Sequence, residues 1–260
     1  MLSSFDSELT AELLWPSSAP HSDVLVVVPF YDTPSVFGEP TGRTRLQSRD
    51  PLINAHGLQL AAAGHAVLAV PWWFELQAAA DPATADEPEL AGRYGPTAAQ
   101  HRTIRPMTAL GRSIGDLMLT VSALHESGLA DGMRLAAFGH SLGAKLAMHL
   151  AALDERIEFA VAHEPGLGFA HSNWDAPWYL DGGVPDGRDQ DELPGLVAPR
   201  PFLLAGGGAS DGVHNLELAR SAAGRWPGAG ELDLLFHDSG HPLPRHLMAA
   251  ISEWLRERSD

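Results

Sequence analysis

The feature that most constrains the fold is a Gly-x-Ser-x-Gly pentapeptide at residues 139–143, set between two segments of different character. The apolar run 134–138 before it predicts a buried strand, and the segment 144–153 after it predicts a helix. A sharp turn between a strand and a helix lifts a serine hydroxyl clear of the sheet. Glycines flank such a turn because side chains there would collide with the neighbouring strand and helix. The pentapeptide therefore predicts a strand, a tight turn and a helix, with Ser141 at the tip.

A second match to the same pattern, at residues 111–115, lies in a different context. Apolar residues recur around it at spacings of three and four, which predicts a continuous amphipathic helix. These residues are Ile104, Met107, Leu110, Ile114, Leu117, Met118, Val121 and Leu124. Ser113 would be held on an ordinary helix, so we discard it as a nucleophile.

The rest of the chain alternates apolar runs with helical patterns. Strands are expected at 24–30, 66–71, 134–139, 159–163, 201–205 and 232–236. Helices are expected at 51–63, 97–127, 142–153, 213–225 and 244–258. The strand segments are almost continuously apolar, as expected when helices cover both faces of a mostly parallel sheet. We therefore predict an α/β protein, a doubly wound sheet in a single domain over residues 1–260.

Two long segments interrupt this alternation, at 74–94 and 166–199. Both are rich in proline and acidic residues and show no clear periodicity. Connections of this length are usually functional or mobile. We expect them to form loops or a small cap above the strand ends.

Charge and composition exclude several classes of function. Lys and Arg number 17 against 33 Asp and Glu, a net charge of −16, so nucleic acid and anionic membranes would be repelled. The chain has no cysteine, which excludes disulfides, thiolate metal sites and a cysteine nucleophile. The acidic segment 1–15 lacks the pattern of a signal peptide, and a cytoplasmic protein is expected. No pattern indicates an oligomeric state.

A serine nucleophile needs a base, and loops at the carboxyl ends of strands supply such groups in open α/β sheets. His241 lies in the loop after the last predicted strand, next to Gly240, and is our choice for the base. His237 is the nearest rival, but its place in the strand register favours a packed or hydrogen-bonded structural role.

The base in turn needs an acid to orient it, and two carboxylates compete for this role. Asp211 lies in the glycine-rich loop after the strand at 201–205, although it also precedes a helix and could be an N-cap. Glu164 directly ends the strand at 159–163. We prefer Asp211 and keep Glu164 as the alternative. The chain order is then Ser141, Asp211 and His241.

These residues carry a resemblance to a known superfamily. Phe138 to Ala144, the segment Ala198 to Leu204 leading to Asp211, and Gly240-His241 resemble the α/β hydrolases, and within them the dienelactone hydrolase and acetyl xylan esterase-like group. The likeness covers nearly the whole chain from Val24 onward.

The resemblance implies hydrolysis of a carboxylic ester of a small molecule, through an acyl-enzyme on Ser141 and with no metal or organic cofactor. The same triad could instead cleave a thioester, lactone or amide, or transfer the acyl group. A binding protein with a hydrolase fold and no activity is a third hypothesis, against which the ordered triad argues.

The oxyanion hole departs from the usual pattern. One donor is expected to be the backbone N–H of Leu142, at the start of the helix. The superfamily often has His-Gly after the strand that supplies the second donor, whereas this chain has Pro29-Phe30-Tyr31-Asp32. Proline has no N–H, so the donor must come from Phe30 or, as we prefer, Tyr31.

Aromatic residues gather near the predicted strand ends and would surround the serine. Such a wall suits an apolar acyl group, an aromatic leaving group or a stacked sugar ring. The residues expected to contact substrate are Phe30, Trp72, Trp73, Trp174 and Trp178.

Overall fold

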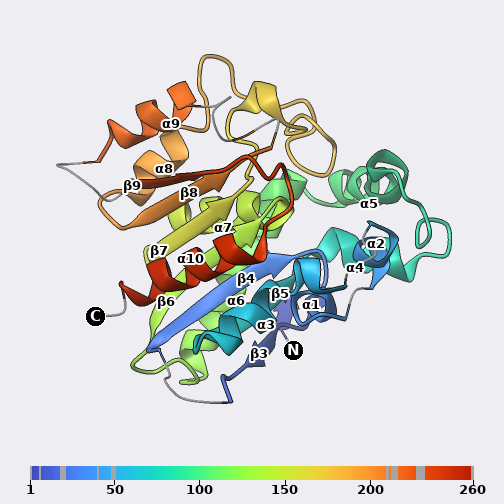
Figure 1. Cartoon of the computed structure of the whole chain (residues 1–260). Coiled ribbons are helices and arrows are strands. Elements are labelled where there is room, and N and C mark those ends of the chain that lie inside the picture. The colour runs from blue at the N-terminus through green and yellow to red at the C-terminus, as the bar shows by residue number, and fades with distance from the viewer. Residues whose placement is uncertain are drawn as a thin grey trace.

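The computed structural model describes residues 2–5, 7–17, 22–39, 41–47, 51–208, 211, 216–226 and 232–258. Its centre is a seven-stranded sheet of order β3-β5-β4-β6-β7-β8-β9 (Figure 1). Every neighbouring pair is parallel except β3 with β5. The strands are β3 (Glu12–Leu14), β4 (Val24–Phe30), β5 (Ala66–Pro71), β6 (Arg134–His140), β7 (Ile157–His163), β8 (Phe202–Gly206) and β9 (Leu232–Phe236). The predicted doubly wound, mostly parallel sheet is confirmed.

A short antiparallel hairpin, β1 (Leu2–Ser4) with β2 (Ser7–Leu9), precedes the sheet. The sequence did not predict this hairpin or the edge strand β3. All three strands have only three residues each, too few to give a clear apolar pattern.

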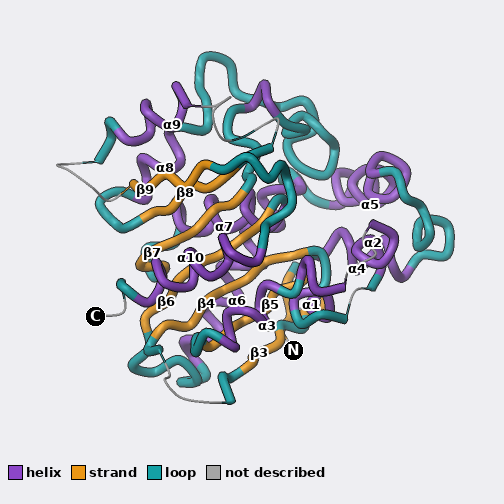
Figure 2. Tube along the Cα trace, viewed as in Figure 1, coloured by secondary structure: helices purple, strands orange, loops and turns teal. Residues whose placement is uncertain are grey.

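Helices cover both faces of the sheet, with α3 and α10 in front and α6 and α7 behind in the view of Figure 1. Figure 2 shows the same layers by secondary structure. The α-helices are α1 (Thr33–Val36), α2 (Gly42–Gln47), α3 (His56–Ala62), α4 (Trp73–Ala80), α5 (Leu90–Ile104), α6 (Ala109–Glu126), α7 (Leu142–Leu153), α8 (Glu192–Val197), α9 (Leu216–Ala223) and α10 (Arg245–Arg256). Two 3₁₀ turns, η1 (Pro51–Asn54) and η2 (Phe169–His171), complete the described helical elements.

Strand β4 shows why the central strands are apolar on both faces. All seven of its residues are buried. Leu25 and Val27 pack into the core on the α6 and α7 side, whereas Val24, Val26 and Val28 pack into the core on the α3 and α10 side. Because successive side chains point to opposite faces of a strand, a sheet covered on both sides needs apolar residues at every position.

The single helix expected at 97–127 is wrong, because two helices, α5 and α6, occupy this region. Pro106 disfavours helical backbone at the residue before it, and Arg105 is extended with φ −127° and ψ 131°. Thr108 then caps α6 by accepting a hydrogen bond from the N–H of Gly111 at 3.0 Å.

Ser113 lies inside α6, as its helical context predicted. Its hydroxyl is buried, donates to the carbonyl of Ala109 at 2.8 Å and accepts from Nε1 of Trp72 at 2.9 Å. This serine therefore has a structural role between α6 and the end of β5.

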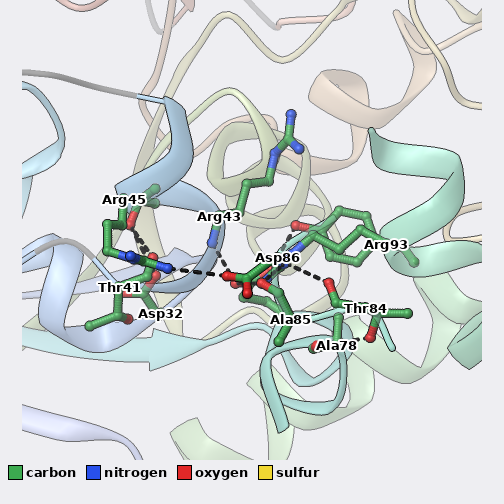
Figure 3. A network of polar contacts seen from close by, with 12 residues as sticks. Asp32, Thr41, Arg43, Arg45, Ala78, Thr84, Ala85, Asp86 and Arg93 are labelled. Atoms are coloured by element: carbon green, nitrogen blue, oxygen red, sulfur yellow. Dashed lines mark hydrogen bonds and ion pairs between the residues drawn. The ribbon is translucent and has the colours of Figure 1, made fainter. Parts of the chain in front are cut away.

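The segment 74–94, expected as a loop or cap, is held together by a buried ion pair. Glu75 of α4 and Arg93 of α5 have almost no exposed side-chain surface, and their charged atoms lie 2.6 Å apart. The Arg93 guanidinium also donates to the carbonyls of Thr84 and Ala85 at 2.9 and 2.7 Å (Figure 3). The two charges neutralise each other, and the remaining N–H groups of Arg93 donate to the loop carbonyls. These contacts hold the segment in position.

The same carboxylate reaches two further elements. Glu75 accepts from the hydroxyl of Tyr94 at 2.8 Å and from the backbone N–H of Arg43 in α2 at 2.9 Å. Glu75 thus joins α2, α4 and α5 into one unit beside the carboxyl ends of β4 and β5.

No helix among the described residues is long and apolar enough to cross a membrane.

His56 gives the fold a measurable sensitivity to acid. This imidazole is buried against the edges of Phe30 and Phe138. Burial lowers its pKa from 6.5 to about 4. Between these two pKa values the unfolded chain binds a proton at His56 and the folded chain does not. The contribution of His56 to stability is therefore fully present above pH 6.5 and is lost as the pH falls towards 4.

We expect this imidazole alone to lower the free energy of unfolding by about 2 kcal/mol between pH 7 and pH 5. Urea unfolding of the parent and of His56→Phe at both pH values measures it. Between pH 7 and pH 5 the variant should lose about 2 kcal/mol less free energy of unfolding than the parent. Equal losses in the two proteins would contradict the lowered pKa of His56.

Candidate active site

Ser141 occupies the turn between β6 and α7 in a strained backbone conformation, with φ 56° and ψ −117°. A Cβ atom at Gly139 would lie within 3.0 Å of the backbone of Gly143. A Cβ atom at Gly143 would lie within 3.0 Å of the carbonyl oxygen of Pro29. Both glycines are therefore required by close backbone approach. The predicted strand, turn and helix are found at this position.

The Ser141 hydroxyl faces the imidazole of His241, with Oγ and Nε2 3.0 Å apart. On the other side of that ring, Nδ1 lies 3.3 Å from Oε2 of Glu164. The three groups follow β6, β9 and β7, whose carboxyl ends share one edge of the sheet. A hydroxyl, an imidazole and a carboxylate in line have the geometry of a nucleophile, its base and an orienting acid.

The Glu164 carboxylate is fully buried, but polar groups surround it. Its Oε1 accepts hydrogen bonds from the backbone N–H groups of Gly207 and Gly208, the second at 2.7 Å. Burial on its own would raise the pKa of Glu164, but the bonds from His241 and these two amides outweigh it and hold the pKa below its usual value. The acid is therefore ionised where it faces the imidazole.

The prediction of Asp211 as the acid needs correction, since Glu164 holds that position. The Asp211 carboxylate is buried and accepts from the backbone N–H groups of Gly166 and Leu167, at 2.9 and 3.1 Å. It ties down the loop that follows Glu164. Burial raises the pKa of Asp211 to about 7.

The sheet order explains why Glu164 is the neighbour of the serine. Strand β7 lies directly beside β6, with His163 paired to His140, so the first residues after the two strands are adjacent. Asp211 follows the more distant β8 by five residues. Chain order is the same for both acids, which is why the sequence left them open.

Two cavities meet at Ser141 and His241. One, of about 220 Å³, is lined by aromatic and cationic residues. The other, of about 260 Å³, is lined mainly by apolar residues and His140. The first contains Tyr31, Arg43, Trp72, Tyr94, Leu142, Lys145 and Trp178, and the second Phe30, Tyr31, Ile53 and Leu243. A reacting bond at the serine would have space on both sides.

Solved structures share this architecture. The chain is similar to a CE15 glucuronoyl esterase from Teredinibacter turnerae T7901, with TM-score 0.64 and 18% identity over 97% of this chain and 70% of that one. It is similar to a glucuronoyl esterase from Solibacter usitatus, with TM-score 0.66 and 15% identity over 95% and 76% of the two chains. A candidate acetyl xylan esterase from Bacteroides fragilis NCTC 9343 gives 0.65 and 18% over 96% and 75%. The chain has the α/β-hydrolase fold.

No family model and no curated protein matches the sequence. The likeness is therefore one of α/β-hydrolase architecture, found through structure.

Lys145 lines this site and was not predicted from the sequence. Its Nζ donates to the carbonyl of Pro165 at 3.0 Å and to Oγ of Ser172 at 2.8 Å, and lies 3.8 Å from the ring centre of Trp174. Burial lowers its pKa to about 7. The signal was its place four residues after Ser141, one turn along α7 on the face towards the site.

The predicted aromatic residues divide into two groups. Trp72, Trp178 and Phe30 line the two cavities at the serine. Trp73 instead lies in a separate cavity beside Arg112, because the first turn of α4 directs it away from its neighbour Trp72. Trp174 is fully buried behind Lys145. For these last two tryptophans the prediction of substrate contact needs correction.

A row of imidazoles extends from the half-buried His237 to His140, the residue before Ser141. His237 and His163 face each other through their Nε2 atoms at 2.9 Å, and His163 and His140 through their Nδ1 atoms at 2.8 Å. The N–H of Ser239 donates to Nδ1 of His237 at 3.2 Å. With neutral rings, His237 then donates to His163, which donates to His140. His237 thus has the hydrogen-bonded position expected of it.

The choice between the two acids can be tested through the reactivity of Ser141. Glu164→Gln removes the charge that would stabilise a His241 imidazolium, and we expect the rate of fluorophosphonate labelling to fall by about 10³-fold or more. Asp211→Asn should label within about tenfold of the parent, because the Asp211 carboxylate accepts from the loop amides of Gly166 and Leu167, whereas Glu164 faces His241. Labelling is followed by intact-protein mass, and the reverse ranking would restore Asp211 as the acid.

Proposed function

We propose that the protein is a serine hydrolase that cleaves a carboxylic ester through an acyl-enzyme on Ser141. The observation that carries the proposal is the alignment of Ser141, His241 and Glu164, with separations of 3.0 and 3.3 Å. A serine hydroxyl is a weak nucleophile alone, and the neighbouring imidazole is what activates it.

In the proposed mechanism, His241 accepts the Ser141 proton as Oγ attacks the ester carbonyl. The imidazolium that forms is stabilised by the ionised Glu164, which also fixes the ring tautomer with Nε2 towards the serine. His241 then gives the proton to the leaving alkoxide. In the second half of the reaction His241 activates a water that releases the acid from Ser141.

The negative charge on the attacked oxygen would be bound by the backbone N–H groups of Leu142 and Tyr31. Both residues line the cavity that contains Ser141. Leu142 is the first residue of α7, so the positive end of the helix dipole adds to its N–H. A backbone N–H can donate to the oxyanion whatever side chain its residue carries. Tyr31 can therefore fill this role although the chain lacks His-Gly at this point.

An ester of a small molecule fits the space at the serine. The two cavities, of about 220 and 260 Å³, suit compact groups on either side of the bond. The names of the similar structures, glucuronoyl and acetyl xylan esterases, favour ester bonds over the thioester, lactone or amide that the same groups could cleave. The aromatic and cationic cavity would take the more polar part of the substrate.

The experiment compares Ser141→Ala with Ser113→Ala, the serine of the other Gly-x-Ser-x-Gly sequence. We expect Ser141→Ala to abolish both fluorophosphonate labelling and turnover of short-chain aryl esters, a loss of at least 10³-fold. Ser113→Ala should keep both, while losing about 1–3 kcal/mol of stability because Trp72 Nε1 loses its acceptor.

Parent protein that neither labels nor turns over esters would overturn the proposal and favour a binding protein. Labelling without ester turnover would instead direct the search to thioesters, lactones and amides.

A further inference from the structure

Three potential metal ligands lie together behind the catalytic histidine. One ligand atom each of His163, Glu164 and His237 lies within 4.8 Å of the other two. His163 and Glu164 are buried and His237 is half-buried, so the cluster opens to solvent on one side. Two imidazoles and one carboxylate form a donor set that suits zinc.

We propose that His163, His237 and Glu164 form an inhibitory site for a divalent transition-metal ion such as Zn²⁺. The metal has no part in the proposed hydrolysis. It takes over the carboxylate on which His241 depends.

The two imidazoles already present the correct atoms. Their Nε2 atoms face each other at 2.9 Å. Tetrahedral zinc with bonds of about 2.0–2.1 Å requires a separation of about 3.3 Å between two ligand nitrogens, so a shift of a few tenths of an ångström brings these two nitrogens to that spacing. The third ligand, Glu164, immediately follows His163 in the chain.

The surroundings support His163 as a ligand. Its other nitrogen, Nδ1, lies 2.8 Å from Nδ1 of His140. Metal-bound histidines usually donate their second N–H to a fixed acceptor, which orients the ring and makes the ligating nitrogen more basic. His140 is that acceptor here, and it is buried at the end of β6.

Binding requires one proton to move. In the metal-free protein the proton of His237 lies on Nε2, because Nδ1 accepts from the N–H of Ser239. When Nε2 binds the ion, the proton moves to Nδ1 and the bond from Ser239 is lost. No proton leaves the site in this exchange. The loop that carries His241 loses one of its ties to β9.

The ion would suppress catalysis through charge. A bound carboxylate shares its negative charge with the metal, so it stabilises the His241 imidazolium poorly. The double positive charge also opposes protonation of His241 during attack by Ser141. Both effects raise the barrier to acyl-enzyme formation.

Binding is tested first on Ser141→Ala, so that the result is independent of hydrolytic activity. Titration calorimetry with Zn²⁺ should show one ion per chain, and His237→Gln in the same background should weaken binding at least tenfold. His246→Gln is the matched control, because His246 is exposed on α10, outside the cluster. Mg²⁺ should not bind, since it prefers all-oxygen sites.

Inhibition, which rests on the proposed function, is tested with active protein and a neutral aryl ester. We expect Zn²⁺ to reduce kcat at least tenfold, with recovery on addition of EDTA, and His237→Gln to resist at the same concentration. Each variant is compared with its own metal-free rate.

Equal zinc affinity in Ser141→Ala with and without His237→Gln would overturn the proposal. So would unchanged inhibition of active His237→Gln, which would place the ion on His241 itself. If no ester is turned over, the calorimetry still decides whether the metal site exists.

Discussion

Close backbone contact at the turn that carries Ser141 is the constraint on which the site depends. The chain at Gly139 and Gly143 approaches its neighbours so closely that no side chain fits, and Ser141 is forced into a left-handed conformation between them. Strand β6, helix α7 and the end of β4 are thereby fixed relative to one another. The serine is positioned by the core of the sheet, and His241 and Glu164 meet it at the same edge.

The sequence predicted most of the fold because the physics there is local. The strands at 24–30 and 66–71 agree residue for residue with β4 and β5, since short continuous apolar runs bounded by turn residues favour buried strands. The helix at 142–153 agrees with α7 for the same reason. The break at Pro106 was missed because the apolar spacing continues across it, although proline itself gave the signal.

The carboxylate that faces His241 could not be settled from the sequence because it depends on which strands are neighbours. Asp211 and Glu164 both follow strands and both precede His241 in the chain. Only the pairing of β6 with β7 brings Glu164 to the imidazole. The predictions of substrate contact for Trp73 and Trp174 were wrong for a similar reason. The direction of Trp73, and the position of Trp174 behind Lys145, are set by the packing of α4 and of the loop after β7, which the local pattern does not contain.

The buried ion pair of Glu75 and Arg93 fixes one wall of the cavity that is lined by Tyr31, Arg43 and Tyr94. One buried carboxylate holds α2, α4 and α5 together and orients Tyr94 at the cavity wall. This wall is already ordered when the protein folds. A bound molecule would therefore lose little affinity to ordering the protein. We therefore expect molecules that do not match the outline of this wall to bind weakly.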